Sequence, residues 1–180
     1  MPERPQTPKL VILDGEGTLY EEDAELPQQP ERWQPLPGAL EAVARLNHAG
    51  WHVVLASNQA GLGRGVFEVS ALNAVHARMH RVLAGAGARV DAVFYCPHAP
   101  EEGCRCRKPA PGLFEQIGER FGIELRGMPA VGDALEDLQA AVAAGCTPHL
   151  VRTGRGAALR DAPLPADYPY IEAVADKGKL

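Results

Sequence analysis

Residues 96–108 hold the side chains best suited to binding a metal. Cys96 and His98 precede a short acidic turn, and Cys104 and Cys106 follow it. Three thiolates and one imidazole make a complete tetrahedral shell for Zn²⁺, and four protein ligands leave no open position for water. Paired ligands on both sides of a turn favour this interpretation over unrelated thiols and a surface histidine. The sequence therefore predicts a zinc loop with a structural role.

The proposed zinc loop ends directly on a basic pair, Arg107 and Lys108. Arginine and lysine are the residues that bind phosphate groups most often. A loop stiffened by metal would hold both cations in one place. This arrangement indicates an anionic substrate.

A second group of candidate residues is carboxylates. Asp14 and Glu16 follow an apolar run and are two residues apart, so they leave the same face of an extended segment. Asp133 follows a separate apolar run. Carboxylates placed together need a cation between them, and hard oxygen ligands are those that Mg²⁺ prefers. With Lys108 and the Ser57 hydroxyl, they form a receptor for a phosphate dianion in which one carboxylate acts as nucleophile, through an aspartyl-phosphate.

Strands and helices that alternate along the chain must position these residues. Short apolar runs predict strands over residues 9–13, 51–56, 90–95, 128–131 and 149–151. Apolar residues at helical spacing predict helices over residues 38–49, 70–83, 111–121 and 135–144. We expect loops at 19–37 and after residue 154, with a short element around 170–175. The alternation predicts an α/β fold: a three-layer, doubly wound, Rossmann-like domain with a mainly parallel sheet. The candidate residues follow its strands, where such sheets bind ligands.

The length and charge of the chain limit the classes of protein it can belong to. Its 180 residues suit one domain over 1–180, including a tail over 154–180. The net charge of −5 argues against binding nucleic acid. No apolar run has the length of a membrane span, and residues 1–9 lack an apolar secretory segment. Three of the four cysteines lie in the zinc loop, which suits a reducing compartment. We expect a cytoplasmic monomer that binds a small phosphorylated metabolite.

Four segments resemble the four motifs of haloacid dehalogenase-like phosphatases: residues 13–18, Ser57-Asn58-Gln59, Lys108, and residues 132–137. The zinc loop resembles the group of that superfamily that contains phosphatases of heptose bisphosphate and of histidinol phosphate. Segments 61–65, 106–109 and 151–154 are more similar to the heptose bisphosphate branch. The similarity covers residues 9–153.

The resemblance implies a role for each matching residue. Asp14 would be the nucleophile and a Mg²⁺ ligand, and Asp133 the second metal carboxylate. Glu16 would give its backbone carbonyl to Mg²⁺ and stand at the general acid–base position. Ser57 and Lys108 would hold the transferring phosphoryl group. The substrate would be recognised by Asn58, Gln59, Ala60, Arg64 and Arg107.

Two features of the sequence keep plainer interpretations open. Asp137 lies one helical turn beyond Asp133 and could orient Lys108, but an acid on a helix surface is an equally good interpretation. His76 and His80 are four residues apart on a helix, with no third ligand or HExxH pattern. They are therefore expected to have surface or packing roles.

The resemblance implies a Mg²⁺-dependent phosphomonoester hydrolase with a structural Zn²⁺ and no large cap domain. A sugar bisphosphate such as D-glycero-D-manno-heptose 1,7-bisphosphate is the expected substrate, and histidinol phosphate is the alternative. The chain departs from the family at Glu16, where the family has aspartate. The added methylene moves the carboxylate by roughly 1.5 Å, and displacement on that scale can cost on the order of 100-fold in rate. A catalytically impaired relative that binds metal and sugar phosphate is therefore the rival hypothesis.

Overall fold

The computed structural model describes residues 8–159 and the backbone of residues 170–171. Its centre is a sheet of six strands in the order β3-β2-β1-β4-β5-β6, and every neighbouring pair is parallel. The strands are β1 Leu10–Leu13, β2 His52–Asn58, β3 Ala92–Cys96, β4 Pro129–Gly132, β5 Thr147–Val151 and β6 Tyr170–Ile171. The doubly wound α/β prediction is confirmed.

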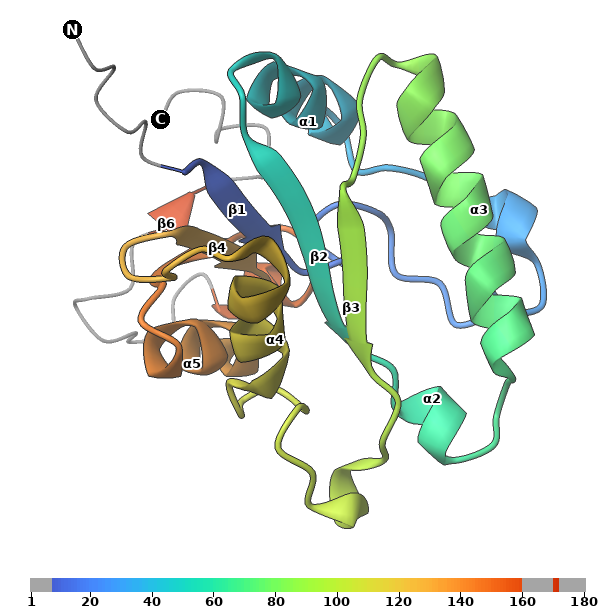
Figure 1. Ribbon diagram of the computed structural model, residues 1–180. Helices are drawn as coiled ribbons and strands as arrows, with labels where there is room; N and C mark the ends of the chain where they lie inside the picture. Colours follow the sequence, from blue (N-terminus) through green and yellow to red (C-terminus); the bar gives the residue numbers. More distant parts are fainter. Residues whose placement is uncertain (1–7, 160–169, 172–180) are drawn as a thin grey trace, which may run out of the picture.

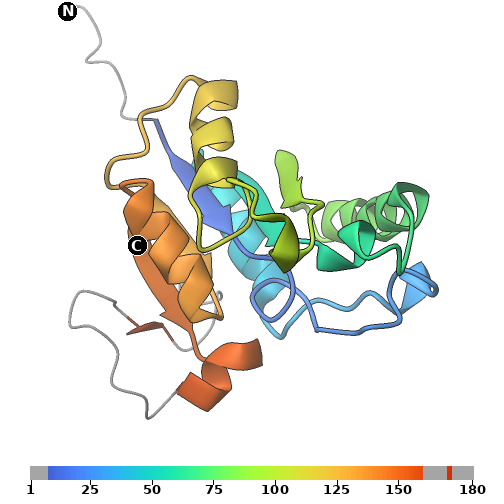
Figure 2. The same cartoon turned by 90° about the horizontal axis from the view of Figure 1, so that it is seen from below.

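Helices cover both faces of the sheet (Figure 1 and Figure 2). One core packs the sheet against α1 Ala39–His48 and α3 Val69–Gly85, and the other packs it against α4 Gly112–Phe121 and α5 Leu135–Ala143. Strand β1 contributes side chains to both cores, because alternate side chains of a strand point to opposite faces of the sheet. Val11 and Leu13 belong to the first core, and Leu10 and Ile12 to the second.

The strand order reverses between β1 and β4, and this reversal determines where the candidate active site lies. From β1 the chain winds outward to β2 and β3, then crosses back to lay β4 on the other side of β1. Loops that leave two such strands diverge and open a crevice at their carboxyl ends. The Asp14 backbone N–H donates to the Val131 carbonyl at 2.9 Å, so the two strand ends lie together. Asp14 and Asp133 therefore meet at this crevice.

Three segments differ from the sequence-based expectation. Strand β2 continues through Ser57 and Asn58, which were expected just after it, and a short helix, α2 Ala60–Gly63, follows where no element was expected. Residues 19–37 lack long elements, as expected, and many of them are exposed, but Trp33 is 1% exposed and its ring packs against Tyr20 at 5.4 Å. Residues 154–159 form a 3₁₀ helix rather than a loop. A short element was expected around residues 170–175. Residues 170–171 form β6, and residues 172–175 lie outside the residues that the structure describes.

The physical reason for these differences is tertiary packing. Polar, proline-rich segments give no periodic signal, yet isolated large apolar side chains still anchor them to a core. At the end of α2, Gly63 packs directly on the zinc loop, with no room for a Cβ beside the Ala99 backbone. Sequence periodicity does not register a contact of this kind.

Candidate active site

Lys108 and Asp14 form a buried ion pair at the carboxyl ends of the strands. The Lys108 side chain is 3% exposed, and its Nζ lies 2.9 Å from Asp14 Oδ1 and 2.7 Å from Asp137 Oδ1. It also donates to the Ala56 carbonyl at 2.8 Å. These three acceptors match the three protons of an ammonium group. Lys108 is therefore held at one position, facing the carboxylate after β1.

The Asp137 carboxylate accepts hydrogen bonds from two backbone N–H groups and from Lys108. Its Oδ2 accepts the backbone N–H groups of Asp133 and Ala134, both at 3.1 Å, at the start of α5. Its other oxygen binds Lys108. Of the two interpretations that the sequence left open, the geometry matches the one in which Asp137 orients Lys108, because its side chain is only 7% exposed.

Three buried carboxylates surround one lysine. Ligand atoms of Asp14, Asp133 and Asp137 all lie within 4.8 Å of one another. Burial raises the pKa of Asp14, and the charge of Asp137 adds to this, while Lys108 opposes it. Burial alone would lower the pKa of Lys108, but Asp14 and Asp137 outweigh it and raise that pKa. Three carboxylates beside one buried ammonium group leave an excess of negative charge, which a divalent cation would reduce.

The atoms left over in this cluster fit Mg²⁺. Asp133 Oδ2 accepts the Arg155 backbone N–H at 2.8 Å, whereas its Oδ1 is buried without a hydrogen-bond partner among the described residues. A buried, unpaired carboxylate oxygen is costly unless it has a ligand. Asp14 and Asp133 would hold the ion through hard oxygen atoms, the donor type that Mg²⁺ requires.

A pocket of about 210 Å³ opens directly above the ion pair. Its lining includes most of the catalytic and substrate-binding candidates from the sequence: Asp14, Glu16, Ser57, Asn58, Gln59, Ala60, Arg107, Lys108 and Asp137. Arg64 is not part of the lining; its guanidinium lies 3.3 Å from Glu101, at the surface. Asp133 lies just beneath the floor and is 1% exposed.

Asn58 faces the backbone of Lys108. Its Oδ1 accepts the Lys108 N–H at 3.0 Å, and its Nδ2 donates to the Lys108 carbonyl at 3.1 Å. Both ends of the amide are thus engaged by the same residue. Asn58 was expected to recognise substrate, but its geometry is that of a clamp that fixes the lysine.

Glu16 is half-buried and lines the pocket. Burial, reinforced by the nearby charge of Glu22, raises the pKa of Glu16 to about 7. A group with a pKa near the working pH can both give and take a proton, which general acid–base catalysis requires. The glutamate in place of aspartate thus has suitable chemistry at this position.

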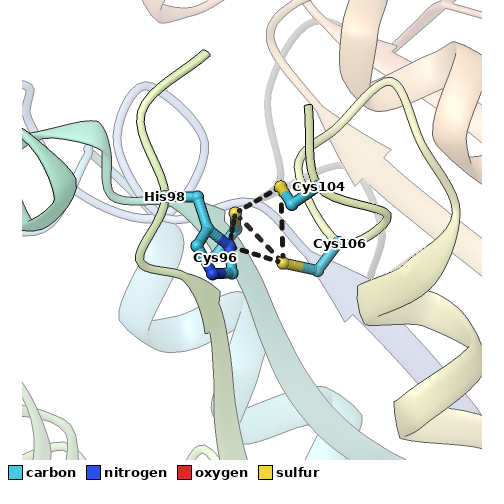
Figure 3. A group of neighbouring side chains, drawn as sticks. All are labelled: Cys96, His98, Cys104 and Cys106. Carbon is cyan, nitrogen blue, oxygen red and sulfur yellow. Dashed lines mark hydrogen bonds between the residues drawn. The ribbon is translucent and has the colours of Figure 1, made fainter. Parts of the chain in front are cut away.

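The four predicted zinc ligands converge on one point (Figure 3). The Sγ atoms of Cys96 and Cys106 are 3.2 Å apart, and Cys104 Sγ lies 3.5 and 3.7 Å from them. His98 Nδ1 lies 3.4 Å from Cys96 Sγ and 3.3 Å from Cys106 Sγ. With Zn–S near 2.3 Å, an ideal tetrahedron has S–S edges of about 3.8 Å. All four cysteines are free, so these atoms fit a zinc ion rather than a disulfide.

The zinc loop is connected to the pocket at two places. The Gln59 N–H donates to the carbonyl of Cys96 at 2.8 Å. Arg107 follows the last ligand and lines the pocket, and its Nη1 is buried without a partner among the described residues. An unpaired guanidinium nitrogen of this kind is available to an anionic ligand.

Sequence reasoning missed three charged residues of the pocket, Glu22, Glu136 and Arg155. Arg155 follows β5, and its Nε lies 3.7 Å from Asp133 Oδ2. Its position just beyond a strand end was the available signal, because ligand-binding residues collect there. Glu22 lies in an aperiodic segment and gave no such signal.

Comparison with known proteins places this fold and site in an enzyme class. Residues 105–177 match the HAD-hydrolase-like family model. The chain is 53% identical over 148 residues to D-glycero-beta-D-manno-heptose-1,7-bisphosphate 7-phosphatase of Bordetella bronchiseptica, covering 82% of this chain and 83% of that protein. The protein of the same name from Pseudomonas aeruginosa is 44% identical, with 87% and 88% covered. The chain therefore belongs to the haloacid dehalogenase-like hydrolase family, and it is a phosphatase.

Solved structures give the same result. A crystal structure of D,D-heptose 1,7-bisphosphate phosphatase from B. bronchiseptica, complexed with magnesium and phosphate, matches with a TM-score of 0.89 and 49% identity, covering 95% of this chain and 96% of that one. The corresponding enzyme from Burkholderia thailandensis matches with a TM-score of 0.74 and 42% identity over the same shares. No helix in the described residues is long and apolar enough to cross a membrane.

Proposed function

We propose that this phosphatase removes the 7-phosphate of D-glycero-β-D-manno-heptose 1,7-bisphosphate. The observation that carries the proposal is the buried Asp14–Lys108 pair at 2.9 Å, at the base of a pocket, in a chain that is 53% identical to an enzyme of that name. The mixed charge of the lining, with Arg107 and Arg155 near the acidic floor, suits a substrate with two phosphates and a hydroxylated carbon chain.

The reaction proceeds in two steps. The Asp14 carboxylate attacks phosphorus while Ser57 and Lys108 hold the phosphoryl oxygens, and Glu16 protonates the departing sugar oxygen. Glu16 then takes a proton from water, which attacks the aspartyl-phosphate and releases inorganic phosphate and free Asp14. Magnesium bound by Asp14, Asp133 and the carbonyl of residue 16 would neutralise charge on the phosphoryl group.

The zinc loop has a structural role in this proposal. Zn²⁺ held by Cys96, His98, Cys104 and Cys106 fixes the loop that carries Arg107 and Lys108. The free thiols support a reducing, cytoplasmic location. We propose that the enzyme acts there as a monomer on a small phosphorylated metabolite.

The position of Glu16 in the pocket lining, beside an intact Asp14–Lys108–Asp137 cluster, favours an active enzyme over a catalytically silent relative. The test is release of inorganic phosphate from heptose 1,7-bisphosphate and from histidinol phosphate, at equal concentrations with Mg²⁺. We expect a higher kcat/KM for the bisphosphate. Faster turnover of histidinol phosphate would overturn the substrate assignment, and no turnover of any ester would overturn the activity.

The Asp14→Asn variant serves as the control for this assay. It keeps the size of the side chain but cannot attack phosphorus, so turnover should be abolished while the circular dichroism spectrum is unchanged. Activity retained by the variant would exclude Asp14 as the nucleophile.

A further inference from the structure

The turn that follows β5, residues 153–155, lies against both strands of the proposed magnesium site. Thr153 Oγ1 donates a hydrogen bond to the carbonyl of Gly17 at 2.6 Å. Two residues later, the Arg155 N–H donates to Asp133 Oδ2 at 2.8 Å. One short turn therefore touches the segment after β1 and the carboxylate after β4.

The packing between these segments leaves no room for other side chains. Gly154 has φ +54°, a region that favours glycine, and a Cβ there would collide with Asp133 Oδ2 and the Gly17 backbone. Gly17 has φ +78°, and a Cβ there would also collide with Asp133 Oδ2. The two glycines allow the turn to approach the carboxylate directly.

These contacts determine which atoms remain available to a cation. The Arg155 N–H occupies Asp133 Oδ2, so Oδ1 is the buried oxygen left without a partner among the described residues. The Thr153 hydroxyl fixes Gly17. Gly17 follows Glu16, and the backbone carbonyl of Glu16 is a proposed Mg²⁺ ligand. Both ligand-bearing segments are held from the same turn.

We propose that residues 153–155 are a positioning element for the magnesium site, with the Thr153 hydroxyl as its removable part. The inference rests on the proposed function, since it assumes that Mg²⁺ binds at Asp14 and Asp133. A hydrogen bond that orients a ligand-bearing group commonly changes metal affinity 10- to 100-fold when it is removed. Thr153 is not among the residues that line the pocket, so its effect should be on the metal.

The test is Mg²⁺ binding to the substrate-free protein, measured by isothermal titration calorimetry. Thr153→Val keeps the shape of the side chain and removes the hydroxyl; we expect its Kd for Mg²⁺ to rise roughly 10-fold. Thr153→Ser restores the hydroxyl and should return Kd close to the parent value. Thr147→Val, the same change at an exposed position at the start of β5, is the matched control and should have no effect.

Further measurements separate positioning from general stabilisation. At saturating Mg²⁺, KM of Thr153→Val for the phosphate ester should equal that of the parent, and so should the melting temperature in Mg²⁺-free buffer that retains Zn²⁺. A parent-like Kd for Mg²⁺ in Thr153→Val would overturn the proposal, as would a loss that serine does not restore. If valine prevents folding, Thr153→Ala is titrated in its place. A parent that binds no Mg²⁺ would instead refute the metal site of the proposed function.

Discussion

At the scale of single residues, the site depends on how firmly Lys108 is held. Its three protons have acceptors, and its backbone is clamped on both sides by the Asn58 amide. The amide crosses from β2 to the end of the zinc loop, so it fixes the lysine relative to the sheet. An error of about 1 Å in the placement of a catalytic group can cost on the order of 100-fold in rate.

Removing this clamp should reduce turnover more than stability. We expect Asn58→Ala to lower kcat by roughly 10- to 100-fold, because Lys108 loses its fixed position. Steady-state kinetics and thermal melting measure the two effects. Asn73→Ala, on an exposed part of α3, is the matched control and should leave kcat unchanged. A parent-like kcat for Asn58→Ala would show that the zinc loop holds the lysine unaided.

Glu16 allows a second test at the same scale. Glu16→Gln removes the titrating proton, and we expect kcat to fall by about 10² to 10⁴ with a sugar phosphate. The loss of kcat should be smaller with an aryl phosphate, because a phenolate is stable enough to leave without being protonated. Glu16→Asp should keep or increase turnover. Equal losses on both substrates would exclude Glu16 as the acid that protonates the leaving group.

At the scale of elements, the zinc loop connects the sheet to the pocket. It begins at the last residue of β3 and ends at Lys108, and it packs against α2 where Gly63 meets the Ala99 backbone. Most of both cores lies between the sheet and the four long helices, but Cys96 belongs to the second core, and Cys104 and Cys106 pack against it. Beyond this contact, the order of the loop would come from the proposed metal.

Zinc removal should accordingly act locally. With a zinc chelator and excess Mg²⁺, we expect amide hydrogen exchange to accelerate over residues 96–108 and KM for the substrate to rise. Exchange in β1, which is fully buried, should stay slow. Cooperative unfolding of the whole chain at the same chelator concentration would contradict this prediction, because the metal would then stabilise the entire fold.

Elements also show how far the sequence could predict the site. Asp14, Lys108 and Asp133 could be placed together from the sequence, because parallel strands bring their carboxyl ends to one edge. The direction of the Asn58 amide could not, since an asparagine in that position can face either ligand or backbone. The turn at 153–155 was missed for a similar reason: its contacts are backbone groups of residues far away in the chain.

At the scale of the whole molecule, a half-buried histidine lies between α3 and the edge strand β3. His76 on α3 packs against Tyr95 of β3, with ring centroids 6.3 Å apart. Burial lowers the pKa of His76 to about 4, and the charge of His80 contributes. The sequence indicated a surface or packing role for His76, and its half-buried position agrees with packing.

The contribution of His76 to stability should therefore fall in mild acid. The unfolded chain binds a proton at His76 near pH 6.5, and the folded chain only near pH 4. The contribution of neutral His76 is present above pH 6.5 and is lost as the pH falls towards 4. After allowance for partial exposure, we expect this contribution to the unfolding free energy to fall by on the order of 1 kcal/mol between pH 7.5 and 5. The raised pKa of Glu16 acts in the opposite direction, because the folded chain binds that proton more readily than the unfolded chain.

Urea denaturation of the parent and of His76→Gln at the two pH values isolates this contribution. From pH 7.5 to 5, the unfolding free energy of the parent should fall relative to that of His76→Gln, whereas His48→Gln, at an exposed position, is the control and should respond like the parent. An identical pH response of the parent and His76→Gln would exclude His76 as a source of acid sensitivity.

The pairing of β1 with β4 has a consequence for biosynthesis. The register aligns Ile12 with Ala130, so the neighbour that completes β1 is translated long after β1 itself. A nascent chain emerges N-terminus first, and until β4 arrives the nucleophile-bearing strand has an open, apolar edge. Such edges recruit other chains. Yield on overexpression should therefore depend on translation rate and chaperone supply more than on the stability of the finished enzyme.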